Sequence, residues 1–124
     1  MDAKLIFQAA TWLLAVAFCS GLAMAFVRFC SDHHSPPWLA KLHGFAAVAA
    51  LSLLVLEWSA SSALPRAGPF GLIALLVAAA AGVFLNLGYH WKRKPLPEWL
   101  VFVHMSIAFI GFLAIGLVTL SLTP

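Results

Sequence analysis

The sequence predicts an all-α membrane protein, a bundle of four transmembrane helices made of two duplicated helical hairpins. Three observations predict this fold. Hydrophobic residues make up 64% of the chain and charged residues only 9%, whereas soluble domains carry about 25% charged residues. Four long apolar stretches are separated by proline-containing breaks. The second half of the chain repeats residues of the first half at a spacing of 61 positions.

Each apolar stretch has the length of a membrane span. The four stretches cover residues 5–29, 39–59, 70–88 and 99–122. Crossing about 30 Å of hydrocarbon takes about 20 residues at about 1.5 Å per residue in a helix. Only a helix satisfies its backbone groups locally in lipid, and no stretch alternates polar and apolar residues like a barrel strand. We therefore expect four helices.

The first stretch could also be a cleaved signal peptide, because residues 21–25 resemble a signal-peptidase site. Its apolar run is longer than that of a typical signal peptide, and its single basic residue, Lys4, is offset by Asp2. In the repeat, this stretch is the counterpart of residues 70–88. We therefore expect it to remain as the first transmembrane helix.

The repeat defines the domain organisation. The matched pairs include Pro36 with Pro97, Trp38 with Trp99, His43 with His104, Ala47 with Ala108, and Gly21 with Gly82. Residues 1–124 should form one transmembrane domain, with repeat 1 at about 1–61 and repeat 2 at about 62–124. Because each repeat holds two helices, the halves should be related by an axis along the membrane normal. The second and fourth helices can then lie diagonally across the bundle.

Basic residues predict the orientation. The first and third loops with their flanks carry five Lys and Arg residues, and the opposite side carries two. The five are Arg28, Lys41, Lys92, Arg93 and Lys94; the two are Lys4 and Arg66. Short loops rich in Lys and Arg stay in the cytoplasm, so both termini should lie outside, as in a bacterial inner-membrane protein. The net charge of +3 is an orientation signal, and a nucleic-acid partner is not expected.

His43 and His104 are the main candidates for a functional site. An ionisable ring within a membrane helix is costly unless it has a partner. Each histidine lies five residues after a tryptophan, Trp38 or Trp99, which places both rings about 7 Å inside the same membrane boundary. Two matched histidines at one depth point to one shared ligand.

Small residues surround both histidines. Four and seven positions further along the same helix faces are Ala47, Ala50, Ala108 and Gly111. The other two helices contribute the matched pair Gly21 and Gly82, and a symmetric glycine pair suggests close approach by another group. Helix packing alone could also explain these glycines. With the histidines, however, the small residues favour a cavity for a flat ligand.

Seven positions after the glycines are Arg28 and Tyr89, which we expect at the membrane edge of the same faces. A guanidinium and a phenol suit carboxylates on a ligand whose body lies deeper. A planar, apolar, carboxylated ligand held by His43 and His104 matches haem b, with both imidazoles on the iron. Bis-histidine ligation leaves no open iron position and favours electron transfer over oxygen chemistry.

In this layout of His43, His104, Gly21 and Gly82, the chain resembles the b561-type four-helix membrane cytochromes. The resemblance implies a membrane-embedded b-type cytochrome whose axial histidines lie on bundle helices. It covers the helical core, and no signature string of the family is present. Those families commonly hold two haems, whereas all five histidines here lie on one side, so the resemblance implies a single-haem variant.

Other interpretations stay open. The two histidines could serve a structural or proton-relay role, or bind another metal. His33 and His34, with Cys30 and His90, could form a rival Zn or Cu site, although their spacing matches no known metal motif. Cys19 and Cys30 are about 16 Å apart along one helix, too far for a disulfide.

Two further residues carry simpler expectations. Asn86 should hydrogen-bond to a neighbouring helix, and Glu57 should be a solvated helix end. No carboxylate lies at mid-membrane, which a small multidrug exporter would need.

The sequence therefore predicts an electron carrier, or a haem-bearing subunit of a larger redox complex, more than a stand-alone enzyme. No catalytic residues are expected. Besides membrane lipid, the expected partners are quinone or a membrane redox protein, because such short loops leave little surface for a soluble partner. The alternative is a non-redox structural or accessory membrane subunit, or a small metal-binding membrane protein.

Overall fold

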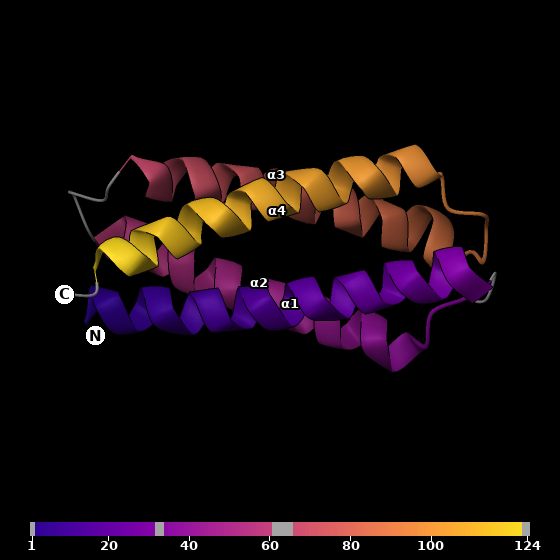
Figure 1. Ribbon diagram of the computed structural model, residues 1–124, viewed down its shortest axis with the longest axis horizontal. Helices are drawn as coiled ribbons and strands as arrows, with labels where there is room; N and C mark the ends of the chain where they lie inside the picture. The colour runs from indigo at the N-terminus through magenta and orange to yellow at the C-terminus, as the bar shows by residue number, and fades with distance from the viewer. Residues whose placement is uncertain (1, 32–33, 61–65, 123–124) are drawn as a thin grey trace.

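The computed structural model describes residues 2–31, 34–60 and 66–122. They form four long helices: α1 (Ala3–Ser31), α2 (Pro37–Ala60), α3 (Ala67–Leu85) and α4 (Glu98–Ser121), with a π-helical turn, η1 (Asn86–His90), directly after α3. The described residues contain no strand. Each helix coincides with one predicted apolar stretch to within a few residues, so the predicted all-α four-helix bundle is confirmed (Figure 1).

Three of the helices begin at residues that favour a helix N-terminus. The Asp2 carboxylate accepts the backbone N–H of Lys4 at 3.1 Å, as an N-cap does. Pro37 is the first residue of α2, where its missing N–H has no helical partner to lose. Pro97 precedes α4 with an extended backbone, and Glu98 places a negative charge in the first turn.

The helices follow one another around the bundle as two hairpins. The most extensive packing lies within each hairpin, α1 against α2 and α3 against α4, and the hairpins meet at the α1–α4 and α2–α3 seams (Figure 1). In the described part of the chain, α2 and α4 make no close backbone contact, and neither do α1 and α3. The two histidine-bearing helices, α2 and α4, are therefore diagonal, as the repeat predicts.

The buried core fills the half of the bundle that holds the chain termini. Its members come from all four helices: Phe7, Ala10, Leu14, Ala50, Leu54, Leu72, Leu75, Ile115 and Val118. Within it, α3 and α4 approach closely, because a Cβ on Gly111 would lie 2.7 Å from Leu75 Cγ and 3.1 Å from the Gly71 carbonyl oxygen. The opposite half of the bundle contains the histidines.

The outside of the bundle is apolar. All four helices are long and apolar enough to cross a membrane, and no more than 28% of their most apolar windows is buried inside the bundle. Large side chains such as Trp12, Phe45 and Phe102 are more than 70% exposed. An apolar surface of this extent suits lipid, which supports a membrane protein.

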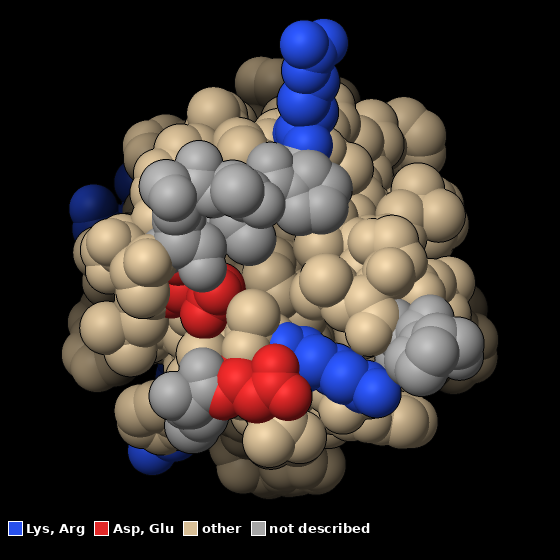
Figure 2. Space-filling model, turned by 90° about the vertical axis from the view of Figure 1, so that its left-hand side faces the viewer, with Lys and Arg blue, Asp and Glu red and all other residues tan. Residues whose placement is uncertain are grey.

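Charged residues gather at the two ends of the bundle. The charged residues nearest the end with the termini are Asp2, Lys4, Glu57 and Arg66, and Figure 2 shows acidic and basic side chains on this face among uncharged residues. Glu57 lies near this end but is only 4% exposed, so the expectation of a solvated Glu57 is wrong. It lies three residues after Leu54, on the stripe of α2 that also buries Ala46 and Ala50. That face packs inward at the helix end as well as at its centre.

Candidate functional site

His43 on α2 and His104 on α4 face each other across the bundle. The centroids of their imidazole rings are 6.2 Å apart, and the ring planes are inclined at 68°. Both rings are half-buried. The structure therefore brings together the two histidines that the repeat pairs in the sequence.

Each imidazole is hydrogen-bonded within its own hairpin. Nδ1 of His43 lies 2.7 Å from the carbonyl oxygen of Ala17, and Nδ1 of His104 lies 2.9 Å from that of Ala78. Ala17 and Ala78 are themselves 61 residues apart, so the two bonds are repeat copies. Because a carbonyl oxygen only accepts, Nδ1 carries the proton and donates, and Nε2 keeps its lone pair. No described residue hydrogen-bonds to either Nε2 atom.

The glycine pair makes these two hydrogen bonds possible. In a helix the carbonyl of residue i bonds the N–H of residue i+4, and the Cβ of residue i+4 tilts back over that carbonyl. Here residue i+4 is Gly21 for Ala17 and Gly82 for Ala78. A Cβ would lie 2.9 Å from Cε1 of His43 at Gly21, and 3.0 Å from Cε1 of His104 at Gly82. Without a side chain, each carbonyl stays open to its imidazole.

This gives the glycines a neighbour that the sequence does not identify. Gly21 and Gly82 line the cavity, where we expect them to leave space for a flat ligand, and each also lies against an imidazole ring. The pattern of matched small residues was a correct signal of close approach. Which group approaches depends on contacts between helices, which the sequence does not contain.

A cavity of about 310 Å³ surrounds the two histidines, at the lower end of the ~300–1,000 Å³ typical of ligand pockets. Its wall is almost entirely apolar side chains from all four helices. All but two of the lining residues have their repeat counterpart in the lining as well. The exceptions are Arg28 and Val48, whose counterparts are Tyr89 and Phe109.

The small residues near the histidines divide between cavity and core. Ala47 and Ala108, four positions after the histidines, line the cavity as expected. Ala50 and Gly111, seven positions after them, are buried in helix packing and do not line it. The cavity reaches Leu51 and Phe112, eight positions after the histidines, and meets the core at Leu14 and Leu75, which belong to both.

Arg28 and Tyr89, the two residues expected at the cavity mouth, are placed differently. Arg28 lines the cavity, whereas Tyr89 does not and packs its ring against Phe84 at 5.9 Å. The cause is η1, in which the N–H of Trp91 bonds the carbonyl of Asn86 five residues back, at 2.7 Å. A π-helical turn holds roughly one residue more than an α-helical turn, which shifts the helical register at Tyr89. His90 lines the cavity, as its counterpart Phe29 does on α1.

Three polar residues at the same end of the cavity as Arg28 were not predicted to line it. They are Ser35, Asn86 and His90. Asn86 was expected to bond across helices, but its side chain makes no hydrogen bond to a described residue. No sequence signal marks the π-helical turn. The Phe29–His90 pairing in the repeat could, however, have placed His90 at the cavity.

The rival metal cluster finds no support in the described residues. His33 lies outside the described residues, so the predicted site cannot be traced at that position. Within residues 2–31, 34–60 and 66–122, no three His, Cys, Asp or Glu side chains come together as a metal-ion site. Cys19 and Cys30 are free and exposed on α1.

The histidine pair suits a metal that brings most of its own ligands. With a metal–imidazole bond of about 2 Å and about 1.1 Å from nitrogen to ring centre, two rings on opposite sides of one metal have centroids roughly 6 Å apart. The measured separation is 6.2 Å. Two histidines are too few for a structural ion, which takes four protein ligands, whereas a macrocycle supplies the other four positions itself.

The chain was also compared with known proteins. No family model, no curated protein and no solved structure matches it.

Proposed function

We propose that this protein is a membrane-embedded b-type cytochrome that carries one bis-histidine haem and acts in electron transfer. The observation that carries the proposal is the symmetric pair of hydrogen bonds from His43 and His104 to the carbonyls of Ala17 and Ala78. Histidines that bind metals almost always donate their other ring N–H to such a group, which orients the ring and raises its basicity. Two rings, both with Nε2 free and 6.2 Å apart, fit the two axial positions of haem.

Each residue of the site has a role in this proposal. His43 and His104 would hold the iron, and Ala17 and Ala78 orient them. Gly21 and Gly82 keep those carbonyls accessible, while Ala47 and Ala108 leave room for the macrocycle. At the mouth, Arg28 and His90 suit the haem carboxylates, since both line the cavity and Tyr89 does not. When bound, haem supplies one-electron chemistry, and the protein sets its orientation and its apolar surroundings.

The proposal agrees with the resemblance to b561-type cytochromes. It differs from their common form in that this chain would hold one haem and not two. The charge distribution supports an orientation with the first and third loops in the cytoplasm of a bacterium, and the histidines in the cytoplasmic half of the inner membrane. Membrane quinone or a membrane redox protein would exchange electrons with it. We propose an electron carrier, or a subunit of a larger redox complex.

The alternative is a structural membrane subunit. It is favoured by one observation, that each histidine already has a carbonyl partner and so satisfies half of its hydrogen-bonding capacity within the protein. In that case the second nitrogen of each ring needs no ligand.

An optical spectrum of the detergent-purified protein separates the two. We expect a low-spin bis-imidazole haem b spectrum at one haem per chain, either as purified or after addition of haemin to the apoprotein. A folded protein that gives no low-spin spectrum with added haemin would reject the proposal and leave the structural role.

A further inference from the structure

The two seams where the hairpins meet are equivalent in the repeat but carry side chains of different size. On α2, the residues facing the α2–α3 seam are Ala40, Gly44 and Val48; their counterparts at the α1–α4 seam are Val101, Met105 and Phe109. Across the seams, Ala79 on α3 is the counterpart of Phe18 on α1. At these four matched positions beside the cavity, the smaller residue lies at the α2–α3 seam; nearer the termini the order is reversed, because Leu72 and Trp58 are larger than Thr11 and Thr119.

Specific contacts between side chains also stabilise the α1–α4 seam. The ring of Phe18 lies 5.7 Å from that of Phe109 and 5.8 Å from that of Phe112. Nearer the termini, the hydroxyls of Thr11 and Thr119 are hydrogen-bonded at 2.7 Å. The counterparts of these threonines at the other seam are Leu72 and Trp58, which cannot make a similar bond. One seam is therefore closed by rings and a hydrogen bond, and the other is not.

The histidines show how a planar ligand lies relative to these seams. Because His43 is bonded to α1 and His104 to α3, each ring belongs to its own hairpin, and the 6.2 Å between them spans the gap between hairpins. A flat ligand that binds both rings lies across the line joining them. Its plane therefore separates the hairpins, and its edges point to the two seams.

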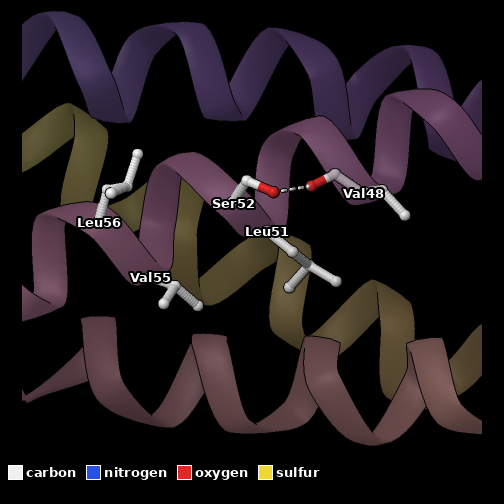
Figure 3. A pocket seen from close by; sticks show the side chains of 5 residues that line it. All are labelled: Val48, Leu51, Ser52, Val55 and Leu56. Carbon is white, nitrogen blue, oxygen red and sulfur yellow. Dashed lines mark hydrogen bonds between the residues drawn. The ribbon is translucent and has the colours of Figure 1, made fainter.

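A shallow hollow lies on the outer surface of α2, and all of its lining residues belong to that helix. Val48 and Leu51 line both the cavity and this hollow, whose other members are Ser52, Val55 and Leu56. In Figure 3, Leu51 and Val55 point to the side of α3, and Ser52 keeps its hydroxyl bonded to the carbonyl of Val48 at 2.9 Å. The two residues that the cavity and this hollow share are therefore both apolar.

We propose that haem enters sideways from the membrane through the α2–α3 seam and keeps one edge there, while the α1–α4 seam stays closed. This inference rests on the proposed function. The proposed occupant of the seam is the macrocycle itself, because a plane held between the two imidazoles has one of its edges at this seam. Its carboxylates remain at the mouth with Arg28 and His90.

Gly44→Met is the most direct test, because it copies Met105 of the closed seam. A Cβ on Gly44 meets nothing within 4 Å, so the change introduces no clash near the backbone, and it removes a helical glycine. We expect the apoprotein to remain folded, with thermal stability equal to or above that of the wild type. Uptake of haemin by the apoprotein in liposomes, followed by the rise of the low-spin spectrum, should be at least tenfold slower.

Gly116→Met is the matched control. Gly116 also has open space around its Cβ, but it lies on α4 outside the cavity lining. It should give the same gain in stability and take up haemin at the wild-type rate. Phe109→Val, which copies Val48 into the closed seam, should leave the rate within about twofold, because the Thr11–Thr119 bond and Phe18 remain.

The outcomes are distinguishable. Wild-type uptake by Gly44→Met, or a tenfold acceleration by Phe109→Val, overturns the inference while the proposed function stands. If the folded wild-type apoprotein never forms the low-spin spectrum, the proposed function itself fails. Val48→Phe is a second seam variant, and it should slow uptake in the same way.

Discussion

The imidazole of His43 is bonded to the carbonyl oxygen of Ala17 at 2.7 Å, beside a glycine whose Cβ would lie within 2.9 Å of the ring. The second hairpin repeats this arrangement with His104, Ala78 and Gly82. A hairpin that orients one imidazole, duplicated, produces two imidazoles that face each other. In this view the symmetry of the site follows from the symmetry of the chain.

Removing either axial histidine should abolish low-spin haem. His43→Ala or His104→Ala leaves the iron with one protein ligand, so the bis-imidazole spectrum of the purified variant should disappear. The control is His34→Ala, which changes a histidine outside the cavity lining and should keep the low-spin spectrum. If both axial variants retain the wild-type spectrum, the assignment of the iron ligands fails.

Adding one methyl group beside each imidazole should weaken haem binding while sparing the fold. In Gly21→Ala and Gly82→Ala the new Cβ forces the ring off its carbonyl. Loss of such an outer partner typically costs about 10–100-fold in metal affinity. For the apoprotein, an overpacking cost of about 1–3 kcal/mol is partly offset by about 1 kcal/mol of helix propensity.

Haemin titration and thermal unfolding in detergent would measure the two effects. Gly116→Ala is the control, because its Cβ meets nothing within 4 Å; it should raise apoprotein stability by about 0.5–1 kcal/mol and leave haem affinity unchanged. Gly21→Ala with wild-type haem affinity would show that the carbonyl bond does not matter for the ligand.

Both termini should lie on the outer, non-cytoplasmic side of the membrane. Five basic residues at the end with the first and third loops, against two at the other, predict that those loops lie in the cytoplasm. A protease added to intact cells should therefore remove a tag from either terminus. Tags that are protected in intact cells and cleaved after lysis would reverse the orientation and move the histidines to the outer half of the membrane.

Arg93→Gly should stabilise the protein. Arg93 is the one described residue other than glycine with a positive φ, 51°, at a helix end closed by bonds from Arg93 N–H to the His90 carbonyl and from Lys94 N–H to the Tyr89 carbonyl. This pattern is a Schellman motif, in which glycine is the preferred residue, and a left-handed conformation costs other residues about 1–2 kcal/mol.

Thermal unfolding of Arg93→Gly should therefore show a gain of about 1 kcal/mol. Lys92→Gly removes the same charge at the neighbouring position, where φ is not positive, and should not be stabilising. An equal gain from both variants would point to the lost charge instead of the backbone conformation.

Much of the fold was predictable because its signals are local. A membrane span is recognised from its length and apolarity, since lipid requires a helix to satisfy its own backbone groups. The repeat made it possible to pair His43 with His104, Gly21 with Gly82 and Ala47 with Ala108 without any coordinates. For this reason four helices and a matched histidine pair were expected before the fold was known.

Other features depend on where side chains meet. The sequence by itself determined the four spans, the two hairpins and which histidines correspond. Only the tertiary structure decided that the glycines contact imidazoles, that Tyr89 at η1 packs against Phe84 and not in the cavity, and that Glu57 is buried. The reason is physical. Apolar periodicity is a property of one helix, whereas a hydrogen-bond partner, a change of helical register and the closed or open state of a seam depend on packing between helices.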